Sequence, residues 1–127
     1  MDQARKNKEF IIEYMNAFVG MTKTREQLEK YTTDETLIQH ILFFDGAFPK
    51  YGGFIDEITA EGNRVIVRAR MKGKHEGELN GIPPTHKEVL FPFVVGYEIE
   101  NNMIVSHWLM ADQMMLMEQL GVMSQPA

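Results

Sequence analysis

Residues 73–85 have the sequence GKHEGELNGIPPT, and residues 104–108 have the sequence IVSHW. The first segment joins His75, at the end of an alternating run, to a turn of glycine and proline, two residues that favour turns. The second places His107 on an apolar run that leads into the last helical segment. These two histidines are therefore the first candidates for functional side chains.

Four strands are predicted around these segments, because apolar and polar residues alternate there with a period of two. Gly62-Asn63 and Asn101-Asn102 are typical of tight hairpin turns between them. In the second strand, basic residues share one face, and apolar residues share the other face with His75. The third and fourth strands are apolar on both faces, which predicts that both faces are covered. The predicted strands are residues 53–61, 64–75, 86–100 and 103–111.

The fourth strand is expected to carry Val105, His107 and Leu109 on its inner face. Ile104, Trp108 and Met110 then lie on the outer face. With Leu90 and Val94 of the third strand, these outer residues form a continuous apolar surface. Such a surface is rarely left in water, so we expect a homodimer that pairs through the sheet.

Helical periodicity precedes and follows the strands. Residues 3–20 predict an amphipathic helix that Gly20 ends. Thr24 begins a short second helix, and Thr32 with Glu35 has the capping-box pattern that begins a third one. The last helix is expected over residues 113–120, after Asp112. Helices first and antiparallel strands afterwards indicate an α+β fold.

Composition limits the classes of function. The 127 residues predict a single domain, residues 1–127. The net charge of −5 argues against binding to nucleic acid. The chain has no cysteine, no signal-peptide pattern and no apolar run long enough to span a bilayer. We therefore expect a cytoplasmic protein without a membrane or nucleic-acid partner.

Several of these segments together resemble the SnoaL-like polyketide cyclase and ester cyclase family, within the nuclear transport factor 2-like superfamily. The similarity extends from about Leu37 to Gly121. It rests on four segments: Ala47-Phe48-Pro49, His75 with Pro83-Pro84-Thr85, His107-Trp108 with Asp112, and Gln119-Leu120-Gly121. His86 stands where the family usually has glycine. The resemblance implies a cone in which a curved, mainly antiparallel sheet wraps the N-terminal helices, with a ligand pocket at its open end.

The resemblance also implies which residues line that pocket. Cyclases of the family carry an acid/base aspartate two residues after the second histidine, where this chain has Leu109. Phe93 and Val95 correspond to polar pocket residues of the cyclases. Because leucine cannot exchange a proton, we expect no cyclase activity of the usual kind. The residues predicted to line the pocket and bind a ligand are Tyr14, Phe91, Phe93, Val95, Tyr97 and Leu109.

The remaining polar candidates are His75, His107 and Asp112. Each histidine is either a hydrogen-bonded structural residue or an acid/base that titrates near neutrality. Asp112 is either the cap of the last helix or a proton relay with His107. His40 and His86 are expected at the surface. No set of ligands at metal-binding spacing and no phosphate-binding loop occurs, so neither a metal nor a cofactor is predicted.

Three functions fit this sequence. The protein is an enzyme that moves protons in a small apolar or polycyclic ligand, by cyclisation, isomerisation or dehydration. Alternatively, it is a carrier or sensor that binds the same ligand without chemistry. In the third case, it is a structural dimerisation module whose pocket is filled by its own side chains.

Overall fold

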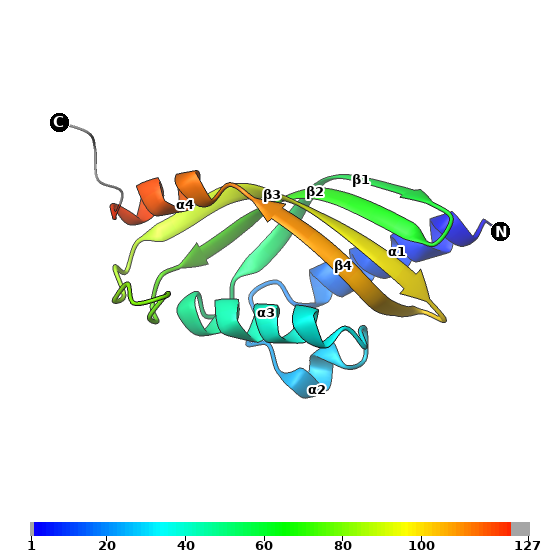
Figure 1. The fold of residues 1–127 in the computed structure, drawn as a ribbon, viewed down its shortest axis with the longest axis horizontal. Coiled ribbons are helices and arrows are strands. Elements are labelled where there is room, and N and C mark those ends of the chain that lie inside the picture. Colours follow the sequence, from blue (N-terminus) through cyan, green and yellow to red (C-terminus); the bar gives the residue numbers. More distant parts are fainter. Residues whose placement is uncertain (1, 123–127) are drawn as a thin grey trace.

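The fold is an antiparallel sheet that curves over helices, in a computed structural model that describes residues 2–122. The sheet has the strand order β1-β2-β3-β4. In Figure 1, α1 and α3 lie under the sheet and α4 lies against its far end, near β3. The elements are α1 (Gln3–Ala17), α2 (Arg25–Leu28), α3 (Glu35–Ala47), β1 (Gly52–Glu61), β2 (Arg64–Lys74), β3 (Glu88–Glu100), β4 (Met103–Ala111) and α4 (Gln113–Leu120). This α+β arrangement confirms the predicted fold class.

Both predicted hairpin turns are present. Gly62 has a φ of 60°, and Asn101 and Asn102 have φ values of 51° and 58°. A two-residue turn with both residues in the left-handed region matches the twist of the flanking strands, and asparagine tolerates that region better than most residues. Within residues 2–122, no helix is both long and apolar enough to cross a membrane.

A β-bulge at Val105 alters the predicted faces of β4. Glu98 pairs with Ser106, whereas Ile99 pairs with Ile104, so Val105 is an extra residue in the ladder. Because side chains alternate with a period of two, one extra residue turns every earlier side chain to the other face. Ile104 is therefore completely buried in the core. Its predicted place on the outer face beside Trp108 is wrong.

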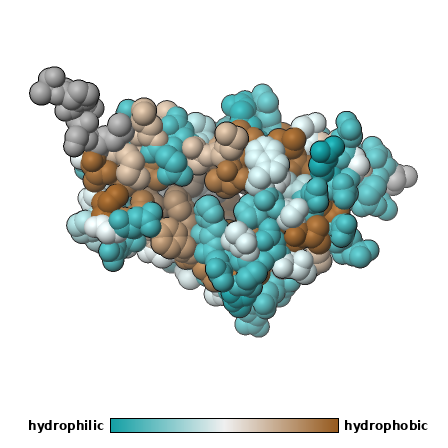
Figure 2. All heavy atoms as spheres, viewed as in Figure 1, coloured by the Kyte–Doolittle hydropathy of each residue, from teal (hydrophilic) through white to brown (hydrophobic). Residues whose placement is uncertain are grey.

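The outer face of the sheet does carry exposed apolar side chains. The indole of Trp108 lies over Gly96, its partner across the ladder. A Cβ on Gly96 would come within 2.3 Å of the indole, so a side chain there would displace it. We use the term outer apolar patch for Ile66, Leu90, Trp108 and Met110, which are 41%, 43%, 49% and 70% exposed. Figure 2 shows hydrophobic side chains that reach the surface between hydrophilic ones.

The first and third helices begin or end differently from the prediction. α1 ends at Ala17 rather than near Gly20, which follows in a turn with a φ of 71°. The N-cap of α3 is Asp34, whose Oδ1 accepts a hydrogen bond from the Leu37 amide. Thr32, the predicted cap, instead donates its hydroxyl proton to the Ile104 carbonyl. The local sequence offers several capping residues in a row, and the contact with β4 selects among them.

Apolar side chains under the sheet form two clusters that leave room between them. The larger cluster joins α1 and α3 to the middle of the sheet, around Ile11, Ile38 and Val67. The smaller one packs Phe48, Leu116 and Leu120 beneath the ends of β2 and β3. Gln119 fastens α4 to this end, because its amide both accepts from and donates to the Leu90 backbone, at 2.7 Å each.

Candidate functional site

A cavity of about 130 Å³ lies between the concave face of the sheet and the helices α1 and α3. All six residues that the sequence predicted for a pocket line it: Tyr14, Phe91, Phe93, Val95, Tyr97 and Leu109. Other apolar residues complete the wall, so a mainly apolar molecule fits its chemistry. Besides Tyr14 and Tyr97, the residues on the wall that carry polar groups are Lys23, His40, Tyr51, His107 and Gln113. That the six residues bind a ligand stays a prediction.

His107 lies on the cavity wall and is held by Asp34. His107 Nδ1 is 2.6 Å from Asp34 Oδ2, and the two side chains are only 9% and 13% exposed. The other carboxylate oxygen of Asp34 accepts from the Leu37 amide. A carboxylate can only accept, so Nδ1 is the protonated nitrogen and Nε2 is left free to take up a proton. This is the arrangement of an oriented general base.

The backbone of residues 31–33 brings Asp34 to His107. The Thr33 amide donates to the Ile104 carbonyl, and the Ile104 amide donates to the Tyr31 carbonyl. These bonds fix the chain just before α3 against the start of β4. Sequence reasoning missed Asp34 because nothing in the local pattern relates it to His107, 73 residues away.

His40 is a second histidine on the same cavity wall. It lies on α3, in the stripe of residues that includes Leu37, Ile41 and Phe44. Its side chain is exposed, as predicted, although one part of it faces the cavity. Partial burial lowers the pKa of His40, and the nearby His107 lowers it further. The helical spacing from Leu37 and Phe44 is a signal that could have placed His40 at the cavity.

Two buried tyrosines meet inside the cavity. Tyr14 and Tyr97 are both 5% exposed, and their rings contact edge to face with centroids 6.0 Å apart. Burial, and then the neighbouring phenol, raise the pKa of Tyr14 well above its usual value, and burial likewise raises the pKa of Tyr97. Both phenols therefore stay protonated near neutral pH and can donate hydrogen bonds to an oxygen atom of a ligand.

Lys23 and Asp45 form a buried ion pair that the sequence reasoning missed. Lys23 Nζ is 3.7 Å from Asp45 Oδ1, and the two side chains are 2% and 11% exposed. Burial lowers the pKa of Lys23, an effect that Asp45 opposes. A lone lysine in a loop gives no signal of burial. The acidic residue within the apolar run 41–48 is a signal that could have marked Asp45 as paired.

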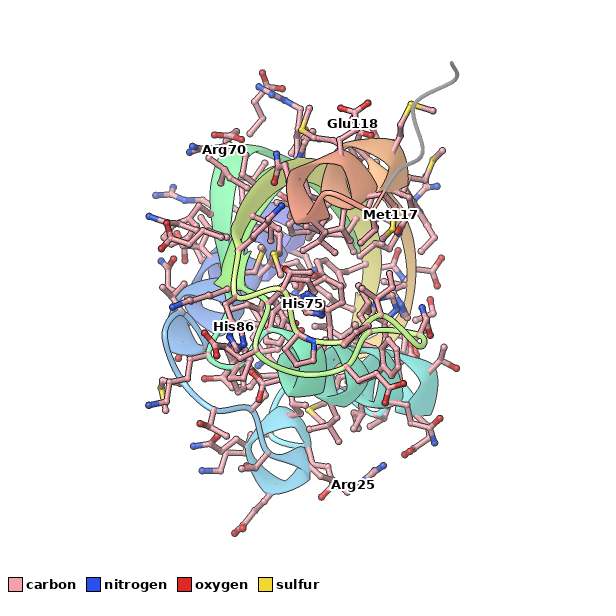
Figure 3. All side chains as sticks on the ribbon, turned by 90° about the vertical axis from the view of Figure 1, so that its left-hand side faces the viewer. Arg25, Arg70, His75, His86, Met117 and Glu118 are labelled. Atoms are coloured by element: carbon pink, nitrogen blue, oxygen red, sulfur yellow. The ribbon has the colours of Figure 1, made fainter. Side chains whose placement is uncertain are left out.

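His75 is not among the residues that line the cavity, and its catalytic role stays a prediction. It is fully buried, its ring stacks on Phe48, and its Nδ1 accepts from the Thr85 amide at 3.1 Å. His75 Nε2 is buried and has no hydrogen-bond partner among residues 2–122. Figure 3 shows His75 inside the loop that follows β2, whereas His86 lies on its outer side.

The glycines around His75 have a packing role. A Cβ on Gly77 would be 2.0 Å from the Gly46 carbonyl oxygen, because the Gly77 amide donates to Ala47 at the end of α3. A Cβ on Gly73 would press on Phe48 and Tyr51, at 3.1–3.2 Å. The Gly-x-His-x-Gly pattern thus fixes the loop to α3.

Asp112 is the N-cap of α4, where its Oδ1 accepts from the Met115 amide at 2.9 Å. It is absent from the cavity wall, and His107 pairs with Asp34 instead. The structure thus shows the cap role of Asp112, and among residues 2–122 it shows no hydrogen bond between Asp112 and His107. Among the residues that the structure describes, no three histidine or acidic side chains are grouped to hold a metal ion.

The fold is shared with several solved structures. AclR, a candidate hydroxylase from Streptomyces galilaeus, superposes with a TM-score of 0.82 at 20% identity, over 98% of this chain and 86% of AclR. A candidate SnoaL-like polyketide cyclase from Jannaschia sp. CCS1 gives 0.81 at 19% identity, over 95% of both chains. IdmH, a candidate polyketide cyclase from Streptomyces antibioticus, gives 0.76 at 21% identity, over 92% of this chain and 99% of IdmH.

Sequence comparison leads to the same group. A search of curated proteins found no match. The family model described as SnoaL-like polyketide cyclase matches residues 20–120, which is most of the chain and includes both His107 and Asp34. The chain therefore belongs to the SnoaL-like polyketide cyclase family.

Proposed function

We propose that this protein binds a small, mainly apolar molecule in its cavity and transfers a proton within it, with His107 as the base. The observation that carries this proposal is the contact of 2.6 Å between His107 Nδ1 and Asp34 Oδ2 at the cavity wall. A buried carboxylate orients the imidazole and stabilises the imidazolium that forms when Nε2 accepts a proton.

The cavity wall supports the same proposal. Most of its residues are apolar, and an apolar site holds little water that could compete for the proton. The protonated phenols of Tyr14 and Tyr97 can donate hydrogen bonds to an oxygen atom whose negative charge grows when the proton leaves. Cyclisation, isomerisation and dehydration all require this type of proton transfer.

A carrier or sensor is the second candidate, and Leu109 favours it. Leu109 lies on the cavity wall, two residues after His107 on the same strand face. An apolar side chain at this place can contact a ligand but cannot exchange a proton. The carrier and the enzyme share the cavity and differ only in whether His107 performs chemistry.

The Kemp elimination separates the two candidates without knowledge of the natural substrate. In 5-nitrobenzisoxazole, a base removes the proton from C3, the N–O bond breaks, and the product is a coloured cyanophenolate. The wild-type protein should accelerate this reaction with saturation. His107→Asn should reduce the rate about 10²-fold or more, since a positioned base typically contributes ~10²–10⁴-fold.

Two controls make the result decisive. Native mass spectrometry of both proteins with the same probe establishes that His107→Asn still binds it. His86→Asn removes an exposed histidine outside the cavity and should leave the rate unchanged. If both proteins bind the probe but neither accelerates the reaction, the enzyme proposal fails and the carrier is favoured.

A further inference from the structure

A buried cation lies at the cavity wall, away from the proposed base. Lys23 Nζ donates to the Met21 carbonyl at 3.0 Å and to the Tyr51 carbonyl. Asp45 Oδ1, at 3.7 Å, is beyond hydrogen-bonding distance of Nζ. An ammonium has three N–H donors, so one of them has no hydrogen-bond acceptor among residues 2–122. Lys23 is one of the residues that line the cavity.

Asp45 is held in place by other partners. Its Oδ2 accepts from the Lys23 amide at 3.3 Å, and its Oδ1 accepts from the Lys50 amide at 3.0 Å. Asp45 therefore balances the charge of the ammonium without occupying its third donor. The ring of Tyr51, 4.0 Å from Nζ, covers one side of the cation.

Helix α3 separates this cation from His107. Asp34, which pairs with His107, caps the N-terminal end of α3, and Asp45 lies near its C-terminal end. Eleven residues at a rise of 1.5 Å each place these two carboxylates about 16 Å apart along the helix axis. The wall between them carries Leu37, Ile41 and Phe44. The cavity thus has the imidazole of His107 near one end and the ammonium of Lys23, a hydrogen-bond donor, near the other. The wall between these two groups is apolar.

We propose that Lys23 is a specificity-determining residue that binds a carbonyl or phenolic oxygen at the end of the ligand remote from His107. The ligand class is then an elongated, mainly apolar ketone, quinone or phenol. A carboxylate fits less well, because Asp45 already neutralises the ammonium and would repel a second anion. This inference rests on the cavity of the proposed function but not on catalysis by His107.

Two naphthalene probes of matched shape test the inference. One is 6-propionyl-2-dimethylaminonaphthalene, a ketone whose fluorescence shifts to the red when its carbonyl accepts a hydrogen bond. The other is the 6-propyl analogue, which lacks the carbonyl oxygen. The wild-type protein should bind the ketone roughly tenfold or more tightly than the propyl compound, as expected for a hydrogen bond to a charged donor.

The variant Lys23→Met should bind the ketone only as tightly as the propyl compound, and the red shift should be lost. Because this variant leaves Asp45 buried and unpaired, Lys23→Met/Asp45→Asn is measured beside it, and circular dichroism monitors folding of both. His86→Asn, which removes an exposed histidine outside the cavity, is the control, and it should retain the preference for the ketone.

Three outcomes would overturn the inference. If the wild type binds the two probes equally tightly, the cavity is still a binding site, but Lys23 does not determine its specificity. A preference for the ketone that persists in the folded double variant assigns the hydrogen bond to another donor, such as a tyrosine. Failure of the wild type to bind either probe overturns this inference together with the ligand-binding part of the proposed function.

Discussion

His107 and Asp34 contact each other through Nδ1 and Oδ2 at 2.6 Å, although 73 residues separate them in the chain. The contact depends on the parallel bridge between Thr32 and Ile104, which joins the segment before α3 to β4. It also places one carboxylate in two roles, as the cap of α3 and as the partner of the imidazole. Substitution of Asp34 by asparagine or by alanine separates these two roles.

Asp34→Asn should reduce proton transfer without a large loss of stability. Asparagine caps a helix about as well as aspartate, but it cannot stabilise an imidazolium with a full negative charge. We expect the Kemp elimination rate to fall by about tenfold or more. This loss is part of the ~10²–10⁴-fold rate increase that a positioned base contributes in total. Asp34→Ala should in addition lower the free energy of unfolding by about 1 kcal/mol, because the cap is lost. Equal rates for Asp34→Asn and the wild type would show that Asp34 is only a cap.

The alternation of the strands, the two hairpin turns and the cap of α4 could be predicted from sequence, because each depends on residues close together in the chain. Asp34 and Lys23 could not, since their partners come from distant segments. The face of Ile104 was predicted wrongly because the alternation along β4 gives no sign of the bulge at Val105, which lies next to the bridge between Ile104 and Thr32. The two readings of His75, structural or acid/base, could not be separated from the sequence, because the buried face of a strand does not show whether it packs against Phe48 or lines the cavity.

Two glycines that contact each other should respond in opposite ways to alanine. In Gly77→Ala the new methyl group meets the Gly46 carbonyl oxygen at 2.0 Å, so the backbone must move. Overpacking of this kind costs about 1–3 kcal/mol, and we expect the upper end of that range. Gly46→Ala meets nothing within 4 Å and lies within α3, so it should stabilise the fold by about 0.5–1 kcal/mol. Urea unfolding of both variants measures these changes, and destabilisation by Gly46→Ala would contradict the open space described around its Cβ position.

The stability of the protein should depend on pH through His40. Its pKa is lowered from 6.5, first by burial and then by His107, so the unfolded state binds more protons than the folded state below that pH. Stability is therefore lost as the pH falls through about 6.5, and the loss ends once the folded state is also protonated. His40→Gln removes this contribution. Urea unfolding between pH 7.5 and 5 should show a smaller loss for His40→Gln than for the wild type, and parallel curves would contradict the prediction.

We propose that the protein forms a dimer through the outer apolar patch. Trp108, the single tryptophan of the chain, is 49% exposed within it. Burial of this patch in a symmetric pair would remove four large apolar side chains of each protomer from water. The tryptophan emission should shift to shorter wavelength as the protein concentration rises, and light scattering should give the mass of a dimer.

A charge within the patch should disrupt this dimer. Trp108→Glu is expected to be a monomer, because it would bury a carboxylate in the interface. Met21→Glu is the matched control, since Met21 is also an exposed apolar residue, 42% accessible, but lies outside the patch. Light scattering that shows a wild-type monomer at micromolar concentration would refute the proposal directly.

Leu109→Asp should give the cavity a carboxylate acid/base group in addition to His107. Leu109 lies opposite Val95 in the ladder and lines the cavity, and it is 36% exposed. Partial solvation at this position lets a carboxylate ionise at a modest cost in stability. The wild type should fail to close an aldol-cyclisation substrate that it binds, whereas Leu109→Asp should gain a rate of about 10²-fold or more. Leu109→Asn, which has nearly the same shape as Leu109→Asp but no charge, should gain nothing.

Any slow turnover by the wild type should disappear in His107→Ala. Efficient wild-type turnover that survives both His107→Ala and His75→Ala would contradict this prediction, because the acid/base would then be another side chain.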